Sequence, residues 1–414
     1  MMSKEKRREP KLRFPGFTED WEQRKLGDFY TFKNGLNKEK VYFGYGDSIV
    51  NFTDVFHNRQ IYSSTLKGKV FVNKKELENF KVKEGDLFFT RTSETIDEIG
   101  FPAVVMEPME RVVFSGFVLR GRAEKNDPLV NIFKSYIFFT DNFRSEMKKK
   151  SSMTTRALTS GTALKEMYFS YPKDLEEQTK IGEILLRLDN VITLHQHKLD
   201  NLKLKKKALL QKLFPKNGER YPELRFPGFT DAWEQRELAE LCNVYDGTHQ
   251  TPRYTNSGVM FVSVENIKTL ESDKYISEDD FKNEFKIFPE FGDILLTRIG
   301  DVGSANIILD NIKRAYYVSL ALLKPKGVNS LFLLALLSSA SVQSEIWKRT
   351  LHIAFPKKIN KNEISKVIVS KPSILEQKKI GELIYALDQI ITLHQRKLDH
   401  LQLQKKALLQ QMFV

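Results

Sequence analysis

The sequence is poor in features on which several classes of protein depend. It has one cysteine, Cys242, which excludes an internal disulfide framework and a cysteine-rich zinc site. The longest apolar run, Leu331 to Leu337, is far shorter than the roughly 20 residues that span a bilayer. The segment Met1 to Lys11 is dense in Lys, Arg and Glu and lacks the apolar stretch of a secretory signal. We therefore expect a cytoplasmic protein without membrane contact.

Motifs of common enzyme classes are also missing. No Gly-x-Gly-x-x-Gly occurs, and Gly68-Lys69 is followed by Val70 where a phosphate-binding loop has Ser or Thr. There is neither an Asn-Pro-Pro-aromatic nor a Pro-Cys element of a methyltransferase, and none of the seven histidines has the His-x-x-x-His spacing of a zinc hydrolase. We expect no catalytic residue, metal or cofactor in this chain. A divergent metal-dependent nuclease stays open as an alternative, because three residues form a suggestive acidic and basic group: Asp141, Glu146 and Lys148.

The chain carries a surplus of positive charge. Lys and Arg number 66 against 53 Asp and Glu, for a formal net charge of +13 and an isoelectric point near 9.4. Such a balance favours a polyanionic partner over an acidic small molecule. Nucleic acid is the first candidate.

An internal repeat is the strongest signal in the sequence. Leu12-Arg-Phe-Pro-Gly-Phe-Thr18, followed by Trp21-Glu-Gln-Arg24, recurs as Leu224-Arg-Phe-Pro-Gly-Phe-Thr230, followed by Trp233-Glu-Gln-Arg236. Gly85-Asp-Leu-Phe-Phe-Thr-Arg91 matches Gly292-Asp-Ile-Leu-Leu-Thr-Arg298. Glu177 to Phe214 matches Glu376 to Phe413 with 25 of 38 positions identical.

The interiors of the two copies differ, although their ends are alike. The offset falls from 212 residues (Phe14 to Phe226) to 207 (Gly85 to Gly292) and 199 (Glu177 to Glu376), so the second copy has lost residues in its middle. The segments Gly27 to Tyr171 and Ala239 to Lys371 align poorly. This contrast predicts one scaffold that carries two different reading surfaces; the alternative is an old duplication that has drifted neutrally.

The third repeat carries a heptad pattern in each copy. Each pattern predicts a helical arm of about 33 residues, or roughly 50 Å. A helix this long with a narrow apolar stripe needs a partner, so we expect the two arms to pair as an antiparallel coiled coil; pairing between chains in a homodimer is the alternative. The predicted seam consists of Ile181, Leu185, Leu188, Ile192, His195, Leu199, Leu202, Leu209, Ile380, Ile384, Leu387, Ile391, His394, Leu398, Leu401 and Leu408.

Two histidines lie on this seam, His195 and His394. They suit either a metal or pH-sensing pair or polar residues that set the register, and we favour the second interpretation.

The rest of the sequence predicts an α+β fold, with two pseudo-repeated domains that are each followed by a long helix. Short β-rich runs such as Val259–Val264 and Asp293–Thr297 are broken by turn signals. Amphipathic helices are expected near 131–149 and 331–348. The expected divisions are 1–174 for the first domain, 175–214 for its helical arm, 215–373 for the second domain and 374–414 for its arm.

Polar and basic loops at matching places in the two middles are the candidate DNA contacts. Arg, Lys, Asn, Gln, His and Thr reach phosphates and base edges. Thr90-Arg91 and Thr297-Arg298 each end a predicted strand. The arginine of each pair either points from a rigid strand end toward DNA or belongs to a structural turn. The candidates are Lys33, Asn34, Asn37, Lys38, Lys40, Arg59, Arg91, Thr92, Asp246, Thr248, His249, Gln250, Thr251, Arg253, Tyr254 and Arg298.

Taken together, these motifs resemble the specificity subunit of type I restriction-modification systems over nearly the whole chain. The resemblance rests on four features: the matching motifs at the start of each repeat (Leu12–Arg24 and Leu224–Arg236, the paired openings), the Asp246-Gly-Thr-His-Gln-Thr-Pro252 block, Gly292–Arg298 and the two arms. It implies two target recognition domains on double-stranded DNA, two methyltransferase subunits, and two ATP-dependent translocase-nuclease subunits recruited by the complex. S-adenosylmethionine, ATP and magnesium would be bound by those partners.

The resemblance agrees with the geometry of DNA. Two similar modules that read one face of B-DNA lie about one helical turn apart, roughly 10 base pairs. If each reads three to five pairs, about five to seven unread pairs lie between the half-sites, and unlike middles predict an asymmetric site. The alternative is a coiled-coil scaffold that binds DNA without reading sequence, whose affinity would fall with salt equally for all sequences.

Overall fold

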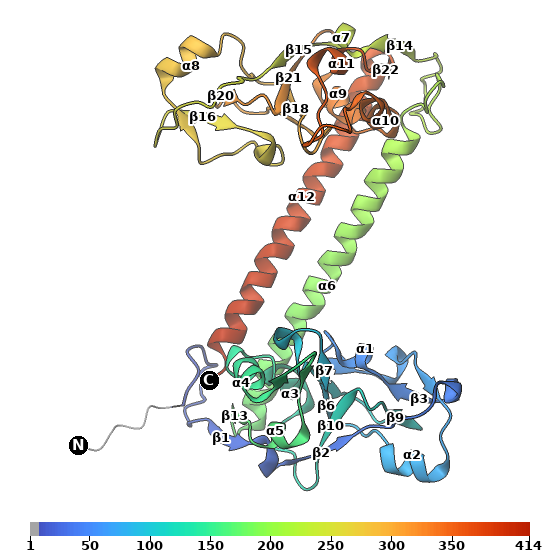
Figure 1. Ribbon diagram of the computed structural model, residues 1–414, viewed down its shortest axis with the longest axis vertical. Coiled ribbons are helices and arrows are strands. Elements are labelled where there is room, and N and C mark those ends of the chain that lie inside the picture. The colour runs from blue at the N-terminus through green and yellow to red at the C-terminus, as the bar shows by residue number, and fades with distance from the viewer. Residues whose placement is uncertain (1–7) are drawn as a thin grey trace, which may run out of the picture. The chain divides into compact units, whose positions relative to one another are not determined.

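The computed structural model describes residues 8–414, which divide into two compact units (Figure 1). Unit 1 comprises the described residues up to His195 together with Lys397–Val414, and unit 2 comprises Gln196–Arg396. Each unit therefore contains one domain and a part of both long helices. This division cuts across the four consecutive segments expected from the sequence.

Unit 1 is built on a five-stranded sheet in the order β2-β10-β6-β8-β4. Neighbouring strands are antiparallel except for the parallel pair β4 and β8. A second sheet has the order β5-β3-β9, and smaller pairings join β1 to β13 and β11 to β12 to β7. The strands are β1 (Glu22–Lys25), β2 (Tyr30–Asn34), β3 (Phe43–Val50), β4 (Gln60–Ile61), β5 (Lys69–Val70), β6 (Leu87–Thr90), β7 (Thr92–Ser93), β8 (Pro102–Val105), β9 (Val112–Phe114), β10 (Val118–Ala123), β11 (Ser152–Met153), β12 (Ala157–Leu158) and β13 (Tyr168–Tyr171).

Unit 2 repeats this plan with fewer strands. Its main sheet has the order β15-β21-β18-β19, its second sheet the order β17-β16-β20, and β14 pairs with β22. In both units the second sheet contains one parallel pair, β3 with β9 and β16 with β20. The strands are β14 (Glu234–Glu237), β15 (Cys242–Asp246), β16 (Val259–Val262), β17 (Tyr275–Ile276), β18 (Ile294–Thr297), β19 (Ala305–Ile307), β20 (Arg314–Tyr316), β21 (Leu320–Pro325) and β22 (Ile368–Lys371).

Short helices complete the two domains. In unit 1 they are α1 (Phe52–Val55), α2 (Lys74–Phe80), α3 (Asn131–Ile137), α4 (Asp141–Lys150) and α5 (Gly161–Lys165), and in unit 2 they are α7 (Leu238–Leu241), α8 (Glu278–Glu284), α9 (Ser330–Leu337), α10 (Ala340–Arg349) and α11 (Lys361–Ser365). Short 3-10 turns cover Leu26–Asp28, Lys40–Tyr42, Ser63–Thr65, Ile96–Glu98 and Val264–Asn266. The mixed helix and sheet content confirms the α+β fold class.

Two expected helices are each broken in two. The segment 131–149 forms α3 and α4, and the segment 331–348 forms α9 and α10. Thr140 and Ser339 precede the second helix of each pair with extended ψ angles of 148° and 151°. Their hydroxyls donate back to the carbonyls of Ile137 (2.9 Å) and Leu336 (2.7 Å). A single continuous helix was therefore wrong at both places, because a Ser or Thr side chain competes for the backbone there.

The long helices are α6 (Leu175–Lys212) and α12 (Ile374–Gln411), each of 38 residues. In unit 1, Lys405 of α12 forms an ion pair with Asp189 of α6. In unit 2, Lys206 of α6 forms an ion pair with Asp388 of α12 at 2.5 Å. Residue numbers rise along one helix as they fall along the other, so the pairing is antiparallel. Every residue of the predicted seam is buried or half-buried.

The core of each unit contains the same aromatic triad. In unit 1, Trp21 packs against Phe133 and Phe413 at ring distances of 5.9 and 6.1 Å. In unit 2, Trp233 packs at 5.9 Å against both Phe214 and Phe332. The two Trp residues come from the paired openings of the repeat, so these motifs serve as anchors between the domain and the end of a long helix.

No single helix of the described chain is long and apolar enough to span a membrane. Helices α9 and α10 reach the length and apolar composition of a membrane span only when they are taken together, and they are bent by 64° relative to each other. Most of the apolar side chains of α9 lie in the core of unit 2.

Candidate nucleic-acid interface

In unit 1, four loop segments meet beyond the ends of the central strands. The loop after β2 lies against the β9–β10 turn, where Leu36 N donates to Phe114 O (2.8 Å). The strand end joins this turn through Arg91 N, which donates to Phe117 O (3.1 Å), and Thr159 N donates to Arg91 O (3.0 Å). We call the segments 34–37, 91–93, 115–117 and 151–159 the unit 1 loop cluster.

Unit 2 has the same arrangement. Thr248 N donates to Tyr316 O (3.2 Å), and Arg298 N donates to Ser319 O (2.9 Å). Ile359 N donates to Arg298 O (2.9 Å), as Thr159 N does to Arg91 O in unit 1. The segments 246–251, 298–300, 317–319 and 350–359 form the unit 2 loop cluster. Sequences that barely align therefore form the same backbone frame.

A glycine allows the closest approach in each cluster. A β-carbon on Gly35 would lie 2.2 Å from the carbonyl oxygen of Ser115, and one on Gly247 would lie 2.5 Å from that of Tyr317. Both distances are far inside van der Waals contact, so only glycine fits. The pairs Asn34-Gly35 and Asp246-Gly247 are thus sites of close backbone contact.

The two clusters differ in how they hold their strand-end arginine. Arg298 is buried, its guanidinium forms an ion pair with Asp246, and its Nε donates to Ile359 O (3.2 Å). Burial lowers the pKa of Arg298. Of the two interpretations of this residue, the structural one fits its geometry, because the side chain braces three loops against one another.

Arg91, by contrast, is half-buried and has no hydrogen-bond or ion-pair partner for its guanidinium among residues 8–414. Asn34, which is exposed, stands where unit 2 has Asp246. The neighbouring Thr92 pairs with Leu158 in the small sheet. Arg91 is therefore free to meet an external phosphate or base edge, whereas Arg298 is not.

The ammonium groups of two candidate lysines, Lys33 and Lys38, are bound by residues of α2 and of the loop between β5 and α2. Lys33 Nζ donates to Asn79 O (2.8 Å), and Lys38 Nζ donates to Phe71 O (2.8 Å) and to the Glu76 carboxylate (2.7 Å). Burial lowers the pKa of Lys33. Both lysines keep a charge close to the cluster, but their ammonium groups are already engaged within unit 1.

Arg59 lies away from the loop cluster. Its guanidinium sits 3.8 Å from the centroid of the Phe139 ring and its Nε lies 3.9 Å from the Asp189 carboxylate. Tyr136 also donates to Asp189 (2.9 Å), and Lys405 completes the group. Burial lowers the pKa of Arg59. The structure therefore assigns this candidate contact to an intramolecular cluster that joins the domain to α6 and α12.

The remaining candidates are mostly exposed. Thr248 and Asp246 are half-buried at the start of their loop. The exposed members are Asn34, Asn37 and Lys40 in unit 1, and His249, Gln250, Thr251, Arg253 and Tyr254 in unit 2. These polar side chains, together with Arg91, are the ones that an external partner can reach.

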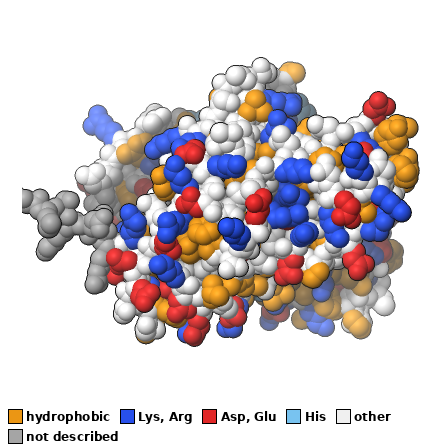
Figure 2. All heavy atoms as spheres, turned by 90° about the horizontal axis from the view of Figure 1, so that it is seen from below, with side chains coloured by type: hydrophobic (Ala, Val, Ile, Leu, Met, Phe, Trp, Pro, Cys, Tyr) orange, Lys and Arg blue, Asp and Glu red, His pale blue; other side chains and the backbone are white. Residues whose placement is uncertain are grey.

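Charge on the visible surface is mixed. Figure 2 shows one face on which Lys and Arg side chains lie among Asp, Glu and hydrophobic side chains. This face has no uninterrupted basic patch, so its charge pattern alone does not mark a binding surface. The loop clusters are identified by their backbone frame instead.

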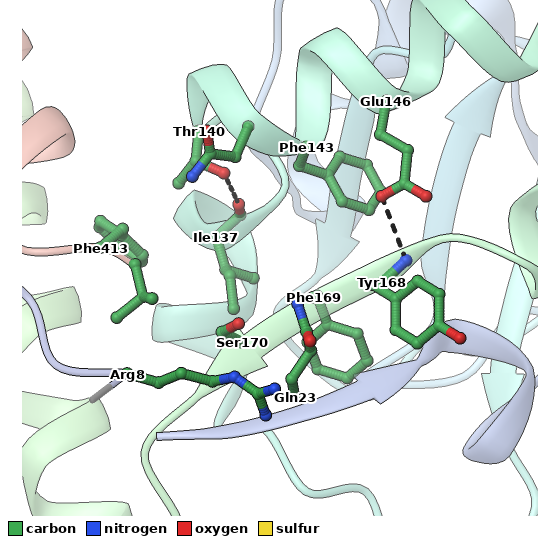
Figure 3. Close-up of a pocket in the computed structure, with 12 residues that line it drawn as sticks. Arg8, Gln23, Ile137, Thr140, Phe143, Glu146, Tyr168, Phe169, Ser170 and Phe413 are labelled. Atoms are coloured by element: carbon green, nitrogen blue, oxygen red, sulfur yellow. Dashed lines mark hydrogen bonds between the residues drawn. The ribbon is translucent and has the colours of Figure 1, made fainter. Parts of the chain in front are cut away.

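A cavity of about 270 Å³ in unit 1 contains one residue of the nuclease alternative (Figure 3). Glu146 lines it and accepts a hydrogen bond from Tyr168 N (3.3 Å). Asp141 accepts instead from Gln410 (3.2 Å), and Lys148 pairs with Asp97 (2.6 Å). The three residues have separate partners and do not converge on one point.

The two seam histidines, His195 and His394, are half-buried on α6 and α12. Among the residues that the structure describes, no group of three or more His, Cys, Asp or Glu could hold a metal ion.

Sequence reasoning missed an exposed apolar stripe outside the seam. Four matched pairs, each 199 residues apart, carry nearly equal exposure in the two repeats. In unit 1 the stripe borders a groove of about 510 Å³ between α6 and α12. The spacing of apolar residues off the seam was the signal that could have revealed it. The residues are Ile184, Val191, Leu194 and Leu403 in unit 1, and Leu383, Ile390, Leu393 and Leu204 in unit 2.

Comparison with known proteins gives consistent matches. The family model "Type I restriction modification DNA specificity domain" matches residues 18–204 and again 230–403. The MjaVIII type I restriction enzyme specificity subunit of Methanocaldococcus jannaschii is 21% identical, with 96% of this chain and 92% of the relative covered. The putative MjaX specificity subunit of the same organism is 23% identical, with 94% and 92% covered.

A solved structure has the same fold. The S subunit of a type I restriction-modification system from M. genitalium matches with a TM-score of 0.61 and 15% identity, over 98% of this chain and 99% of that one. Because the family model covers most of both repeats, the chain belongs to the family of type I restriction-modification specificity subunits, with two target recognition domains.

Proposed function

We propose that this chain is the non-catalytic subunit that reads an asymmetric, split DNA site for its partners. The observation that carries the proposal is the pair of loop clusters, which share one backbone frame and present different side chains. A shared frame places both sets of side chains alike against DNA, whereas different side chains contact different bases. Each unit then reads one half-site.

The candidate contacts divide into two kinds. Arg91 and Lys40 suit phosphates or guanine edges, and Asn37 and Gln250 suit adenine edges. His249 and Arg253 lie on the same exposed loop of unit 2 and add donors there. Direct base contacts of this kind are each worth ~1–3 kcal/mol of discrimination.

The matched apolar stripes support two copies of one partner. Because the exposed residues recur in both units with nearly equal exposure, a subunit that covers one stripe also fits the other. We propose that the two stripes bind two methyltransferase subunits, which methylate adenine. Two translocase-nuclease subunits join through the complex and carry out ATP-dependent cleavage. S-adenosylmethionine, ATP and magnesium belong to those partners.

The paired helices set the distance between half-sites, with an unread gap of about 5–7 base pairs. Inserting four or seven residues into both α6 and α12 is expected to lengthen the gap in the methylated site. An unchanged gap would reject the role of the helices as a spacer.

The direct test is co-expression with the cognate methyltransferase subunit in a cell without adenine methylation, followed by genome-wide mapping of methylated adenines. One asymmetric split motif with a fixed gap is expected. No methylation from an assembled complex would favour a scaffold that binds all DNA alike, whose affinity falls with salt equally for every sequence. Metal-dependent cutting of DNA by the purified chain alone would favour the nuclease alternative.

A further inference from the structure

The loop Leu351–Lys358 of unit 2, which we call the finger, carries the most exposed hydrophobic side chains of the described chain. Ile353 and Phe355 have relative exposures of 99% and 104%, whereas no other large hydrophobic side chain exceeds 68%. Both lie in the tip formed by His352–Lys357, which belongs to the unit 2 loop cluster. Two such side chains on one tip mark a binding feature, since single exposed hydrophobic residues are ordinarily scattered.

The stem of the finger is fixed by backbone hydrogen bonds. Leu351 N donates to Lys358 O (2.8 Å), which closes the stem. Gly300 N donates to Lys357 O (2.8 Å), which ties the finger to the strand end beside Arg298. The tip therefore projects from a held base, so little ordering is needed when it meets a partner.

Basic and aromatic side chains surround the base of the finger. Lys357 Nζ lies 4.7 Å from the centroid of the Trp347 ring, and the His352 ring lies 4.1 Å from the same ring. Lys358 follows directly and is exposed. Two lysines beside an apolar tip complement a polyanion whose interior is apolar.

The matched loop of unit 1, 151–159, lacks the exposed aromatic side chain. Thr159 N and Ile359 N make matching hydrogen bonds to the carbonyl oxygens of the two strand-end arginines. When the two loops are aligned at these residues, Thr155 stands opposite Phe355 and Arg156 stands opposite Pro356. Met153 stands opposite Ile353 and is 53% exposed, so both loops carry one exposed aliphatic side chain and only the aromatic side chain belongs to one half-site alone.

We propose that Phe355, with Ile353 beside it, inserts between two stacked base pairs at the half-site read by unit 2. Apolar side chains such as Phe and Ile wedge between base steps and kink the duplex, while neighbouring lysines hold the phosphates. The inference rests on the proposed function. It predicts a preference for a flexible pyrimidine–purine step at the insertion point, because such steps unstack most easily.

The test uses the complete complex with its methyltransferase subunits and a duplex that contains the mapped motif, with fluorescent dyes at its two ends. Phe355→Ala is expected to weaken binding about tenfold, lower the energy transfer between the dyes, and leave the slope of affinity against salt unchanged. Lys357→Gln is the charged control, which lowers that slope by about one phosphate contact and keeps the bend. Thr155→Ala is the matched control in unit 1 and leaves both quantities unchanged.

Three outcomes would overturn the finger proposal. Affinity within twofold of wild type, or weaker binding with unchanged energy transfer, would reject insertion. Loss of methyltransferase from the Phe355→Ala complex, with normal DNA binding by what assembles, would place the finger at a subunit interface. Because the wild-type complex must first methylate a split motif, failure of that step identifies failure of the proposed function instead.

Discussion

In unit 1, Arg13 donates two hydrogen bonds to Glu177 (2.7 and 2.8 Å), and in unit 2 Arg225 donates two to Glu376 (2.8 Å each). These pairs, like the aromatic triads, join an opening motif to a long helix in the same way. The loop clusters differ instead, in Arg91 against Arg298 and in the finger. The ends of each repeat therefore build a common frame, and the interiors supply what differs between the half-sites.

Breaking the ion pair that joins an opening motif to a long helix should lower the free energy of unfolding by the same amount in both units. Arg225→Met removes the arginine partner of the Glu376 carboxylate, which is 1% exposed, and Arg13→Met leaves Glu177 with only a long hydrogen bond from Trp21 Nε1 (3.4 Å). Removing one partner of a buried ion pair destabilises by ~3–5 kcal/mol. We expect both variants to lose stability in this range in urea unfolding. A difference of more than about half of the larger effect would contradict an equivalent frame.

A smaller and unequal effect is expected where the units differ in their contacts with the helices. Asp189 has Tyr136, Arg59 and Lys405 around it, whereas Asp388 pairs with Lys206. Hydrogen bonds to charged groups contribute ~1.5–3 kcal/mol, and partly exposed ion pairs ~0–1 kcal/mol.

Asp189→Asn should therefore destabilise by ~2–3 kcal/mol and Asp388→Asn by less than ~1 kcal/mol. The two variants carry the same chemical change at matched repeat positions, so each is the control for the other. Equal losses in thermal unfolding would show that the extra partners of Asp189 add nothing.

The smallest effect concerns the first residue of an edge strand of the main sheet, which is Tyr30 of β2 in unit 1 and Cys242 of β15 in unit 2. Burial raises the pKa of Cys242 to about 12. The unfolded thiol titrates near pH ~8.5, so the folded state keeps a proton that the unfolded state loses.

The stabilisation from Cys242 is complete below pH ~8.5 and is lost as pH rises towards 12. Relative to Cys242→Ala, the protein should lose ~1 kcal/mol of stability between pH 8 and pH 9.5. Identical pH profiles for the two proteins, measured by urea unfolding, would mean that the thiol ionises freely in the folded chain.

The repeat and the heptads predicted the two domains and the antiparallel helices, and the alternation of short β-rich runs with turn signals predicted the α+β class. These features follow from periodicity and self-similarity, which are written directly in the order of residues. The breaks at Thr140 and Ser339 were missed because Ser and Thr also occur inside helices, and the back-bonded hydroxyls that accompany the breaks are visible only in the structure.

The candidate site was predicted less well, for a physical reason. Arg91 and Arg298 end matching strands, yet only the three-dimensional position of Asp246 decides that one is engaged and the other is free. Arg59 has the chemistry of a DNA contact and lies instead against Phe139. The exposure of Phe355 follows from the fixed stem of the finger, and no local pattern in the sequence distinguishes it from a core aromatic.

A change confined to one loop cluster, followed by mapping of methylated adenines, tests whether each unit reads its own half-site. Asn34→Ala, Asn37→Ala and Arg91→Ala are combined in unit 1, and the complex with methyltransferase is expressed in a cell without adenine methylation. If each unit reads its own half-site, one half-site becomes relaxed at one or more positions, while the other half-site and the gap remain as in wild type. Changes in both half-sites, or in neither, would mean that the two units do not each read one half-site.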